Sequence, residues 1–583
     1  MKRQSGGVRL DGSVRCWRAV LVALAILTGV VPAYSQDVDA RVLKAQAKRM
    51  EVIRGAAQSV VAIFGLTEEG GGSGVLISKD GFALSNYHVT SGAGDFMKCG
   101  LNDGSLYDAV IVGIDPTGDV ALIKLLGRDD FPVATMGDSD QLQIGDWVYA
   151  MGNPFLLATD FTPTVTYGIV SGTHRYQYPA GGFLEYTDCI QIDASINPGN
   201  SGGPLFNAAG ELVGINGRAS FEKRGRINSG AAYAISINQI KNFMDHLRSG
   251  RIVDHGSLSA TVSATLDGSV IVDELLDTSD VFRRGVREQT EVISFAGRPI
   301  RSVNQFKNIL GIYPNGWKLP LTFREGGEVR KTFVRLRPLH SEREMAQFSK
   351  KNSGRPQQTR PGQKPPPKPP KKYEKMLVKK PGFANFYFNK LAQDRVAGSL
   401  KAWGDYAARA GRTWIMSGQT ADAESFEIVL SRAGLGLNVG DEKTYYQPGN
   451  DWQLDNEPPD SGGFLTAMNH LRRLLTEYDK GFTDFAYFGG EPLDGDGPMV
   501  DVLRAAEGSV VSRWYFSRKD GGLLGFDTRM AEEWDECEVR FLDFRKFDGL
   551  TLPSKMRVRS GEKEYGVFEV ERVEFRSAGK AAA

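Results

Sequence analysis

The chain has 583 residues, of which 41% are hydrophobic and 24% charged, and its formal net charge is +1. This composition is ordinary for a soluble globular protein, and a near-neutral charge gives no reason to expect nucleic acid as a partner. A chain of this length exceeds what one hydrophobic core supports, so we expect about three or four domains.

The first 35 residues have the pattern of a secretory signal peptide. Basic residues at positions 2, 3, 9, 15 and 18 precede an apolar run at 19–31, and Ala33-Tyr34-Ser35 supplies the small residues that a signal peptidase needs. The apolar run is shorter than the ~20 residues that span a bilayer. We therefore expect residues 1–35 to be removed and the protein to be exported, with an uncleaved membrane anchor as the alternative.

Five further segments follow. Residues 36–58 have helix-forming composition, and residues 59–250 are short β-rich runs divided by glycines, a texture that predicts a barrel or sandwich pair. Residues 256–338 form a smaller module of strands with one helix-like stretch. Residues 341–380, rich in Lys, Arg, Gln and Pro, predict a disordered, extended linker. Residues 381–577 return to strands with glycine turns, so the fold class is mainly β.

Three segments carry residues for nucleophilic catalysis: LSNYHVTSG with His88, GDVALIKL with Asp119, and NPGNSGGPL with Ser201. A serine hydroxyl needs an imidazole to take its proton and a carboxylate to orient that imidazole. The order His, Asp, Ser is that of the chymotrypsin arrangement. Asp115 lies four residues before Asp119 and competes with it, or else shapes the Asp115-Pro116 turn.

The cysteines, at positions 16, 99, 189 and 537, have no paired spacing. Such scattered thiols indicate neither a disulfide framework nor a zinc site. We expect no metal and no cofactor.

Residues 59–250 resemble the protease domain of the HtrA/Deg family of chymotrypsin-like double β-barrels. The resemblance rests on GGSGVLISKDGFALSNYHV, GIDPTGDVALIKL, GDWVYAMGNPF, TVTYGIVSG and IQIDASINPGNSGGPLFNAAGELVGIN. It implies that the first barrel supplies His88 and Asp119, and that the second supplies Ser201. It also implies an oxyanion hole made by the backbone N–H groups of Gly199 and Ser201.

Substrate preference follows only coarsely from the sequence. Ser195 stands six residues before Ser201, where trypsin-like enzymes place an aspartate at the pocket floor. Ile192, Ile215 and Asn216 are further candidates for the pocket wall. A neutral or apolar pocket of this kind favours cleavage after small aliphatic residues.

Residues 256–338 resemble the PDZ domain that follows HtrA proteases, through VFRRGVREQTEVISFAGRPIRSVNQFKNIL and WKLPLTFREGGEVRKTFVRL. Such a domain adds an extended peptide to a sheet edge and holds its terminal carboxylate in backbone N–H groups. The candidate cradle consists of Ser257, Leu258, Ser259 and Ala260.

The DFRKFDGLTLPSKMRV segment resembles a strand pair of LolA-like half-barrels, which implies a groove for an apolar ligand. The alternative for residues 381–577 is a structural or protein-binding β-rich domain.

Taken together, these patterns indicate an envelope serine endopeptidase that cleaves unfolded or damaged proteins. The resemblance implies the periplasm as its compartment, with secretion or membrane association as alternatives, and a homotrimer as its assembly. The competing interpretation is a chaperone or scaffold that uses the PDZ-like and C-terminal domains and has little protease activity.

Overall fold

The computed structural model describes residues 39–66, 71–153, 160–177, 183–221, 228–352, 369–447 and 457–577. The predicted signal peptide, residues 1–35, lies outside the described residues, as does the middle of the predicted linker. The predicted N-terminal helical segment contains helix α2 (Ala40–Ala57). Among the described residues, no helix combines the length and apolar character needed to cross a membrane.

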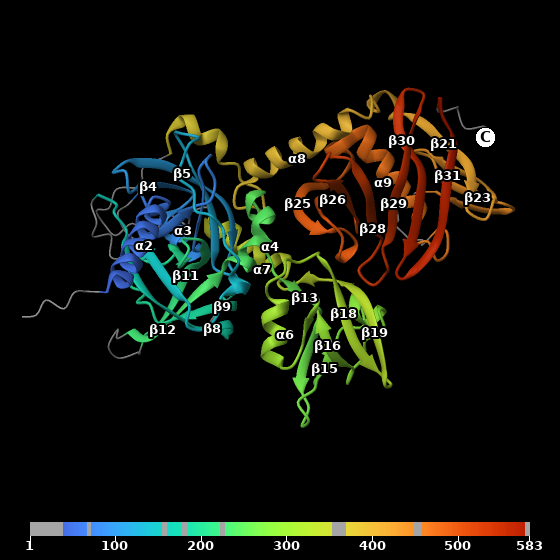
Figure 1. The fold of residues 1–583 in the computed structure, drawn as a ribbon. Helices are drawn as coiled ribbons and strands as arrows, with labels where there is room; N and C mark the ends of the chain where they lie inside the picture. The colour runs from blue at the N-terminus through green and yellow to red at the C-terminus, as the bar shows by residue number, and fades with distance from the viewer. Residues whose placement is uncertain are drawn as a thin grey trace, which may run out of the picture. The chain divides into compact units, whose positions relative to one another are not determined.

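Two closed six-stranded antiparallel barrels follow α2 (Figure 1). The first has the strand order β1-β2-β3-β6-β5-β4, and the second has the order β10-β11-β12-β9-β8-β7. The first barrel consists of β1 (Val60–Phe64), β2 (Gly71–Leu76), β3 (Phe82–Ser85), β4 (Phe96–Leu101), β5 (Leu106–Asp115) and β6 (Val120–Leu125), with α3 (Tyr87–Ala93) after β3. The second consists of β7 (Trp147–Gly152), β8 (Thr164–Gln177), β9 (Tyr186–Ile192), β10 (Pro204–Asn207), β11 (Leu212–Phe221) and β12 (Asn228–Ser236), and η1 (Ser139–Gln141) precedes it.

Strand β5 shows why strands of the two barrels are apolar along their whole length. Val110 and Val112 pack in one hydrophobic cluster, whereas Ala109 and Ile111 pack in another. Successive side chains of a strand point to opposite faces, so a strand covered on both faces has no polar alternation. Helix α4 (Ile237–Arg248) covers β5 so closely that a Cβ atom on Gly113 would lie 2.2 Å from the Leu247 carbonyl oxygen.

The third module has a five-stranded path, β14-β15-β16-β18-β19, with β17 paired to β16. Its strands are β13 (Gly256–Ser257), β14 (Ala260–Ala264), β15 (Val270–Leu275), β16 (Glu291–Phe295), β17 (Arg298–Pro299), β18 (Lys318–Glu325), β19 (Glu328–Arg335) and β20 (Arg337–Pro338), and its helices are α5 (Asp280–Arg283) and α6 (Val303–Leu310). Strand β14 ends the path, so it is an edge of this sheet.

The predicted linker is not extended throughout its length, and for its two ends the prediction is wrong. Residues Glu342–Asn352 form helix α7, and Lys371–Met376 form a 3-10 helix, η3. Phe348 on α7 is buried and contacts the ring of Tyr87 at 6.0 Å between centroids. One buried aromatic residue thus anchors a segment whose overall composition indicated disorder.

The C-terminal module is an eleven-stranded antiparallel sheet with the order β24-β23-β22-β21-β31-β30-β29-β28-β27-β26-β25. Its strands are β21 (Arg412–Thr420), β22 (Ser425–Leu430), β23 (Leu435–Val439), β24 (Glu442–Tyr446), β25 (Asp484–Pro492), β26 (Met499–Glu507), β27 (Val510–Ser517), β28 (Leu523–Arg529), β29 (Cys537–Phe547), β30 (Leu550–Ser560) and β31 (Lys563–Ser577). Its helical elements are α8 (Phe386–Lys401), η4 (Ala407–Arg409), α9 (Phe464–Glu477), η5 (Tyr478–Gly481) and η6 (Leu493–Gly495).

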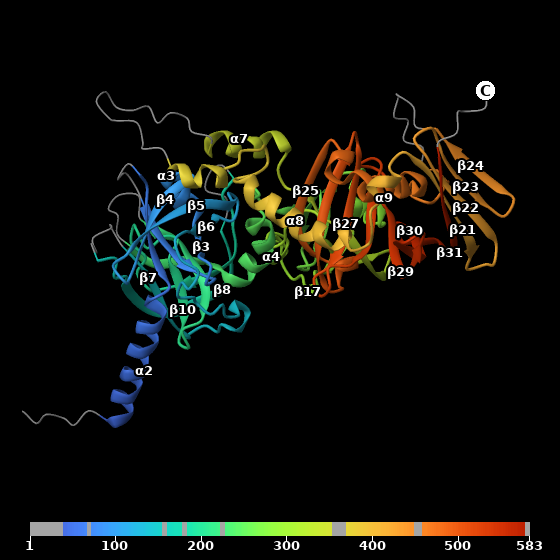
Figure 2. The same cartoon turned by 90° about the horizontal axis from the view of Figure 1, so that it is seen from above.

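Figure 2 shows the two edge strands of this sheet, β24 and β25, on opposite sides of α9. Phe464, Leu471 and Leu474 of α9 are buried with residues from across the sheet, such as Trp514 and Phe568. Helix α9 therefore fills the apolar face of the sheet with its own side chains.

Candidate functional site

His88 and Asp119 form a directly bonded pair in the first barrel. His88 is on α3, and Asp119 stands in the turn before β6 with a φ of 57°, a left-handed conformation that aspartate tolerates better than most residues. The Nδ1 atom of His88 lies 2.8 Å from Oδ2 of Asp119, and the backbone N–H of His88 donates to Oδ1 at 3.0 Å. The carboxylate thus orients the imidazole so that Nε2 remains as the proton acceptor.

Tyr186 is a third member of this network that the sequence patterns did not reveal. It begins β9 in the second barrel, is buried, and donates its hydroxyl hydrogen to Asp119 Oδ2 at 2.7 Å. The same carboxylate oxygen therefore accepts from both barrels. Nothing in the spacing of the chain points to this residue, because the contact spans 67 positions.

Burial and the neighbouring Asp119 have opposite effects on the pKa of His88. Burial disfavours the imidazolium, but the hydrogen bond and the negative charge of Asp119 outweigh burial and raise the pKa of His88 above its ordinary value. Because the imidazole side chain is about half exposed, it remains within reach of a substrate.

Ser201 lies in a loop against the His88-bearing segment. A Cβ atom on Gly72 would fall 2.7 Å from a methyl of Val89 and 2.9 Å from the Ser201 carbonyl oxygen, which places the two segments side by side. The Ser201 hydroxyl donates to the carbonyl oxygen of Gly217 at 3.3 Å. The hydroxyl would therefore have to rotate away from Gly217 to donate to another acceptor.

Ser73 of β2 fixes the backbone around the nucleophile. Its hydroxyl donates to the Gly199 carbonyl oxygen at 2.7 Å, and its N–H donates to the Ser201 carbonyl oxygen at 2.9 Å. Ser73 is fully buried, and Ser85 donates to its carbonyl at 2.7 Å. Gly199 has a φ of 104°, which only glycine adopts readily. The first barrel thus determines the course of a loop that belongs to the second.

Asp115, the competitor of Asp119, is engaged elsewhere. Its Oδ1 accepts from the N–H groups of Thr117 at 3.1 Å and Gly118 at 2.8 Å, as expected for a turn-shaping aspartate. Its Oδ2 lies 2.9 Å from Nε2 of His255, and both side chains are buried. Asp115 therefore joins a structural pair and makes no contact with His88 among the described hydrogen bonds.

The predicted pocket residues do not share one environment. Ile192 and Ile215 have no exposed surface, which corrects the expectation that they line an accessible wall. Ile192 packs in an apolar cluster of the second barrel, and Ile215 packs in a cluster that both barrels share. Asn216 is also fully buried, and its amide donates to the carbonyl oxygen of Pro204 at 3.0 Å. Ser195 is exposed.

The predicted peptide cradle is partly occupied by its own side chains. The Ser257 hydroxyl accepts the N–H of Ser259 at 3.0 Å, and Leu258 is buried in the core of the module. Ser259 has a φ of 55°. Ala260 begins the edge strand β14, so the backbone next to the cradle is placed where a peptide strand could be added.

Helix α6 of the third module is bonded to strands β8 and β9 of the second barrel. The side-chain oxygen of Asn308 accepts the N–H of Asp188 at 2.9 Å, and its amide nitrogen donates to the His174 carbonyl oxygen at 2.7 Å. The buried Asn308 thus bridges two strands of the barrel, and no sequence motif predicted this contact.

One group of side chains has the composition of a metal site. Donor atoms of Asp140, His174 and Asp188 lie within 4.8 Å of one another. Asp140 already pairs with Arg298 at 2.9 Å, and His174 Nδ1 lies 2.6 Å from Asp188 Oδ1. The two carboxylates are thus engaged by side chains, and the cluster carries no argument for a metal.

Residues 72–215 match the family described as Trypsin-like peptidase domain. The matched stretch includes His88, Asp119 and Ser201 and most of both barrels. This part of the chain is therefore a trypsin-like peptidase domain, and the prediction of a chymotrypsin-like double barrel is confirmed.

The curated relatives that this chain matches are named DegP-like serine endoproteases, in agreement with the resemblance to the HtrA/Deg family. A "Probable periplasmic serine endoprotease DegP-like" from Chlamydia trachomatis serovar D is 35% identical over 268 residues, covering 44% of this chain and 52% of that protein. A protein of the same name from Marinomonas sp. is 38% identical over 251 residues, covering 41% and 51%. The chain spans about half the length of the curated relatives it matches.

Among solved structures, the chain is similar to an "HtrA-type protease AlgW with tripeptide". That likeness has a TM-score of 0.42 at 30% identity and covers 50% of this chain and 98% of the other.

Proposed function

We propose that this protein is a serine endopeptidase of the cell envelope that cleaves unfolded or damaged proteins. The observation that carries the proposal is the His88–Asp119 pair, bonded at 2.8 Å inside a trypsin-like peptidase domain and beside the loop of Ser201.

In the proposed reaction, Ser201 Oγ attacks the scissile carbonyl carbon while Nε2 of His88 takes its proton. The N–H groups of Gly199 and Ser201 stabilise the oxyanion, and His88 then donates the proton to the leaving amine. A water molecule, deprotonated by His88, releases the acyl group from Ser201. Asp119 stabilises the imidazolium throughout and is not itself protonated.

The same proposal covers compartment and partners. The basic and apolar leader at 1–35 supports export, and the relatives are named periplasmic, so we assign the protein to the periplasm. The free edge of β14 supports capture of a peptide C-terminus at Ser257–Ala260. A homotrimer completes the proposal, and light scattering of the purified protein measures it directly.

The decisive experiment compares the exported protein with its S201A variant on unfolded casein and on folded control protein, together with labelling by a fluorophosphonate probe. We expect casein cleavage and labelled Ser201 in the wild type, and neither in S201A. Cleavage that survives in S201A would refute the proposal. Casein protected from aggregation without any cleavage or labelling, even after addition of C-terminal peptides, would instead support the scaffold or chaperone alternative.

A further inference from the structure

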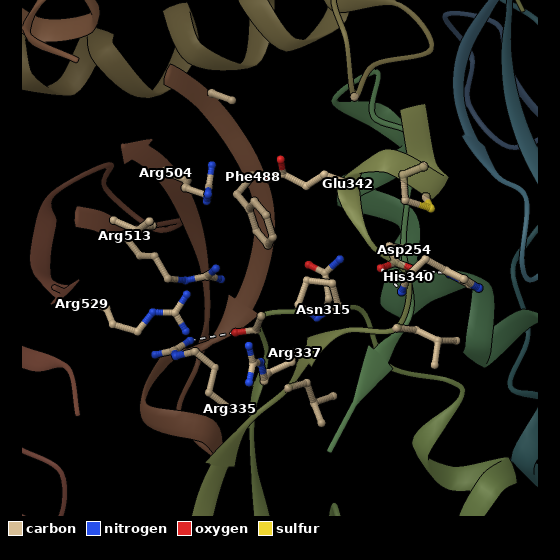
Figure 3. Close-up of a pocket in the computed structure, with 18 of the residues that line it drawn as sticks. Asp254, Asn315, Arg335, Arg337, His340, Glu342, Phe488, Arg504, Arg513 and Arg529 are labelled. Atoms are coloured by element: carbon tan, nitrogen blue, oxygen red, sulfur yellow. Dashed lines mark hydrogen bonds and ion pairs between the residues drawn. The ribbon is translucent and has the colours of Figure 1, made fainter. Parts of the chain in front are cut away.

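A cavity of about 860 Å³ lies outside the peptidase site, among the PDZ-like module, helix α7 and the C-terminal sheet. Its volume is in the range of small-molecule sites. Figure 3 shows Arg504, Arg513 and Arg529 extending from neighbouring strands of the sheet toward the same space, with Phe488 beside them. The cavity is therefore lined by a concentration of guanidinium groups.

The strand register makes this concentration unusual. Arg504 of β26 pairs directly with Arg513 of β27, and Arg513 in turn pairs with Asp527 of β28, two residues from Arg529. The three arginines therefore share one face of three adjacent strands. Like charges placed directly opposite each other destabilise a sheet, so this arrangement carries a cost that the local fold does not require.

Acidic side chains compensate the arginines only in part. Arg513 pairs with Glu491, and Arg504 pairs at 3.1 Å with Asp484, an aspartate that Lys380 also contacts at 3.1 Å. Within the described part of the chain, no ion pair is found for Arg529.

A fourth arginine, Arg251, also lines the cavity and also has no ion pair among the described residues. Its guanidinium lies 4.4 Å from the centre of the Phe488 ring, and that of Arg513 lies 4.5 Å from the same ring. The buried Nε of Arg513 has no hydrogen-bond partner in the described structure. Burying a donor without a partner is unfavourable, and a bound acceptor would remove that cost.

Most of the other acidic side chains that line the cavity are paired with a cation. Glu532 pairs with Arg337, Glu536 pairs with Arg335 at 2.8 Å, and Glu538 pairs with Lys318 at 2.5 Å. Glu342, exposed at the start of α7, also lines the cavity but forms no ion pair within the described residues. Two guanidinium groups, those of Arg251 and Arg529, are therefore left without a bonded carboxylate.

The pKa values of the cluster record its excess of positive charge. Burial lowers the pKa of Arg251 to about 10, and the charges of Arg504 and Arg513 act in the same direction. Burial, followed by the charges of Arg251 and Arg513, holds the pKa of His246 well below its ordinary range, so this neighbour stays neutral. An anion in the cavity would oppose the effect of the neighbouring positive charges on these pKa values, but not the effect of burial.

We propose that this cavity is a binding site for a phosphate group carried by a small phosphate ester. Arg251 and Arg529 have no ion pair among the described residues, so their positive charges can pair with a phosphate group, and the planar fork of arginine fits its oxygens. The cavity is much larger than a phosphate ion, which favours an ester over the free ion. This site is separate from the peptidase centre and does not depend on the proposed function.

The test uses the full-length S201A protein, so that autolysis cannot interfere. Inorganic phosphate and phenyl phosphate are titrated by calorimetry, and thermal shifts are compared with sodium chloride at equal ionic strength. We expect saturable binding of phenyl phosphate that is tighter than that of inorganic phosphate. Saturable binding of inorganic phosphate alone would overturn the ester, and saturation by neither would overturn the site.

Variants locate the site. R529M removes an arginine without an ion pair, and R529K keeps the charge but loses the fork. We expect R529M to weaken phenyl phosphate binding about tenfold or more and R529K to weaken it less. R572M, which removes an exposed arginine on β31, is the matched control and should bind as S201A does. Equal affinity in R529M and R572M, with both folded by circular dichroism, would refute the assignment.

Discussion

Ser73 shows how one buried hydroxyl can control chemistry that it never touches. The Ser73 hydroxyl donates to the Gly199 carbonyl oxygen and the Ser73 backbone N–H donates to the Ser201 carbonyl oxygen; Gly199 and Ser201 are the two residues whose N–H groups are proposed to hold the oxyanion. Each peptide unit is planar, so holding the Gly199 carbonyl also fixes the Gly199–Asn200 peptide, which lies between those two N–H groups. Ser73 is therefore a positioning residue, with its effect confined to the loop geometry.

We predict that S73A lowers kcat by about tenfold to a hundredfold, a smaller loss than the ~10²–10³ that follows removal of an oxyanion donor itself. KM should change little, because the substrate is bound elsewhere. A peptide boronic acid, which forms a tetrahedral adduct on Ser201, should bind more weakly to S73A. The matched control is S78A, which removes a hydroxyl that accepts the N–H of Phe82 in the same barrel. Equal boronate affinity in S73A and wild type would exclude the positioning role.

The raised pKa of His88 predicts the acid limb of activity. A general base must be neutral, so kcat/KM should rise with pH through the pKa of His88, with a midpoint above the ordinary value of about 6.5. In D119N the anion that stabilises the imidazolium is gone, so the residual activity should show a limb at lower pH and a rate lower by about 10⁴. D115N should keep both the wild-type limb and most of the rate. A limb that shifts in D115N and not in D119N would contradict the assignment.

The sequence predicts Ser201, His88 and Asp119 because the proposed reaction requires these residue types, and the structure brings His88 and Asp119 together. Tyr186 and Ser73 act by hydrogen bonds across 67 and 126 positions, and any buried hydroxyl would look the same in the sequence. Ile192 and Ile215 were misjudged because an apolar residue near the nucleophile serves the barrel core equally well.

Among the elements, α6 is distinguished by the polar residue on its barrel-facing side. Asn308 is buried, and its two side-chain polar atoms are both bonded to the β8–β9 region. An amide side chain can satisfy one N–H and one carbonyl at once, which an apolar contact cannot. Asn308 thus links α6 by hydrogen bonds to β8 and β9, the strands that precede the Ser201 loop.

We predict that N308A loosens this link without unfolding α6. The N–H of Asp188 loses its acceptor, so hydrogen–deuterium exchange measured by mass spectrometry should accelerate in peptides covering Tyr186–Ile192. Exchange in β2 and β3 should be unchanged. The control is N304A, a substitution on the same helix. Unaltered exchange at Tyr186–Ile192 in N308A would show that the hydrogen bond does not hold these strands.

Strands were more predictable than helices in this chain. Apolar runs divided by glycines predicted the strands of the barrels and of the C-terminal sheet, because an apolar run and a glycine turn are both local features of the sequence. Helix α7 was not predicted, because its own residues are mostly polar. Its Phe348 packs against the first barrel, which is far away in the sequence. The eleven-strand order likewise depends on pairings such as β21 with β31, which no local signal specifies.

At the scale of the whole molecule, the module at residues 256–338 and the C-terminal sheet are joined by buried charges centred on Arg335. Its guanidinium pairs with Asp527 at 2.6 Å, with Glu536 at 2.8 Å and with Glu491 at 3.3 Å. Arg540 also pairs with Asp527 at 2.7 Å. Burial alone would raise the pKa of Asp527, but the charges of Arg540 and Arg335 overcome burial and hold that pKa well below its ordinary value.

We predict that R335M destabilises the protein by about 3–5 kcal/mol, because it leaves buried carboxylates without their shared cation. R324M removes an exposed pair with Glu291 in the same module and should cost at most about 1 kcal/mol. Urea unfolding in the S201A background, followed by tryptophan fluorescence, measures both.

The pH dependence of R335M separates charge from packing. A carboxyl group with a depressed pKa contributes its stability above the unfolded value of about 3.9 and loses it as the pH falls toward the folded value. Because Arg335 helps to depress the pKa of Asp527, the stability difference between S201A and its R335M derivative should be full at pH 7 and shrink below about pH 4. A difference that stays constant down to pH 3 would mean that Arg335 acts through the packing of its aliphatic stem, and not through the buried ion pairs that connect the two modules.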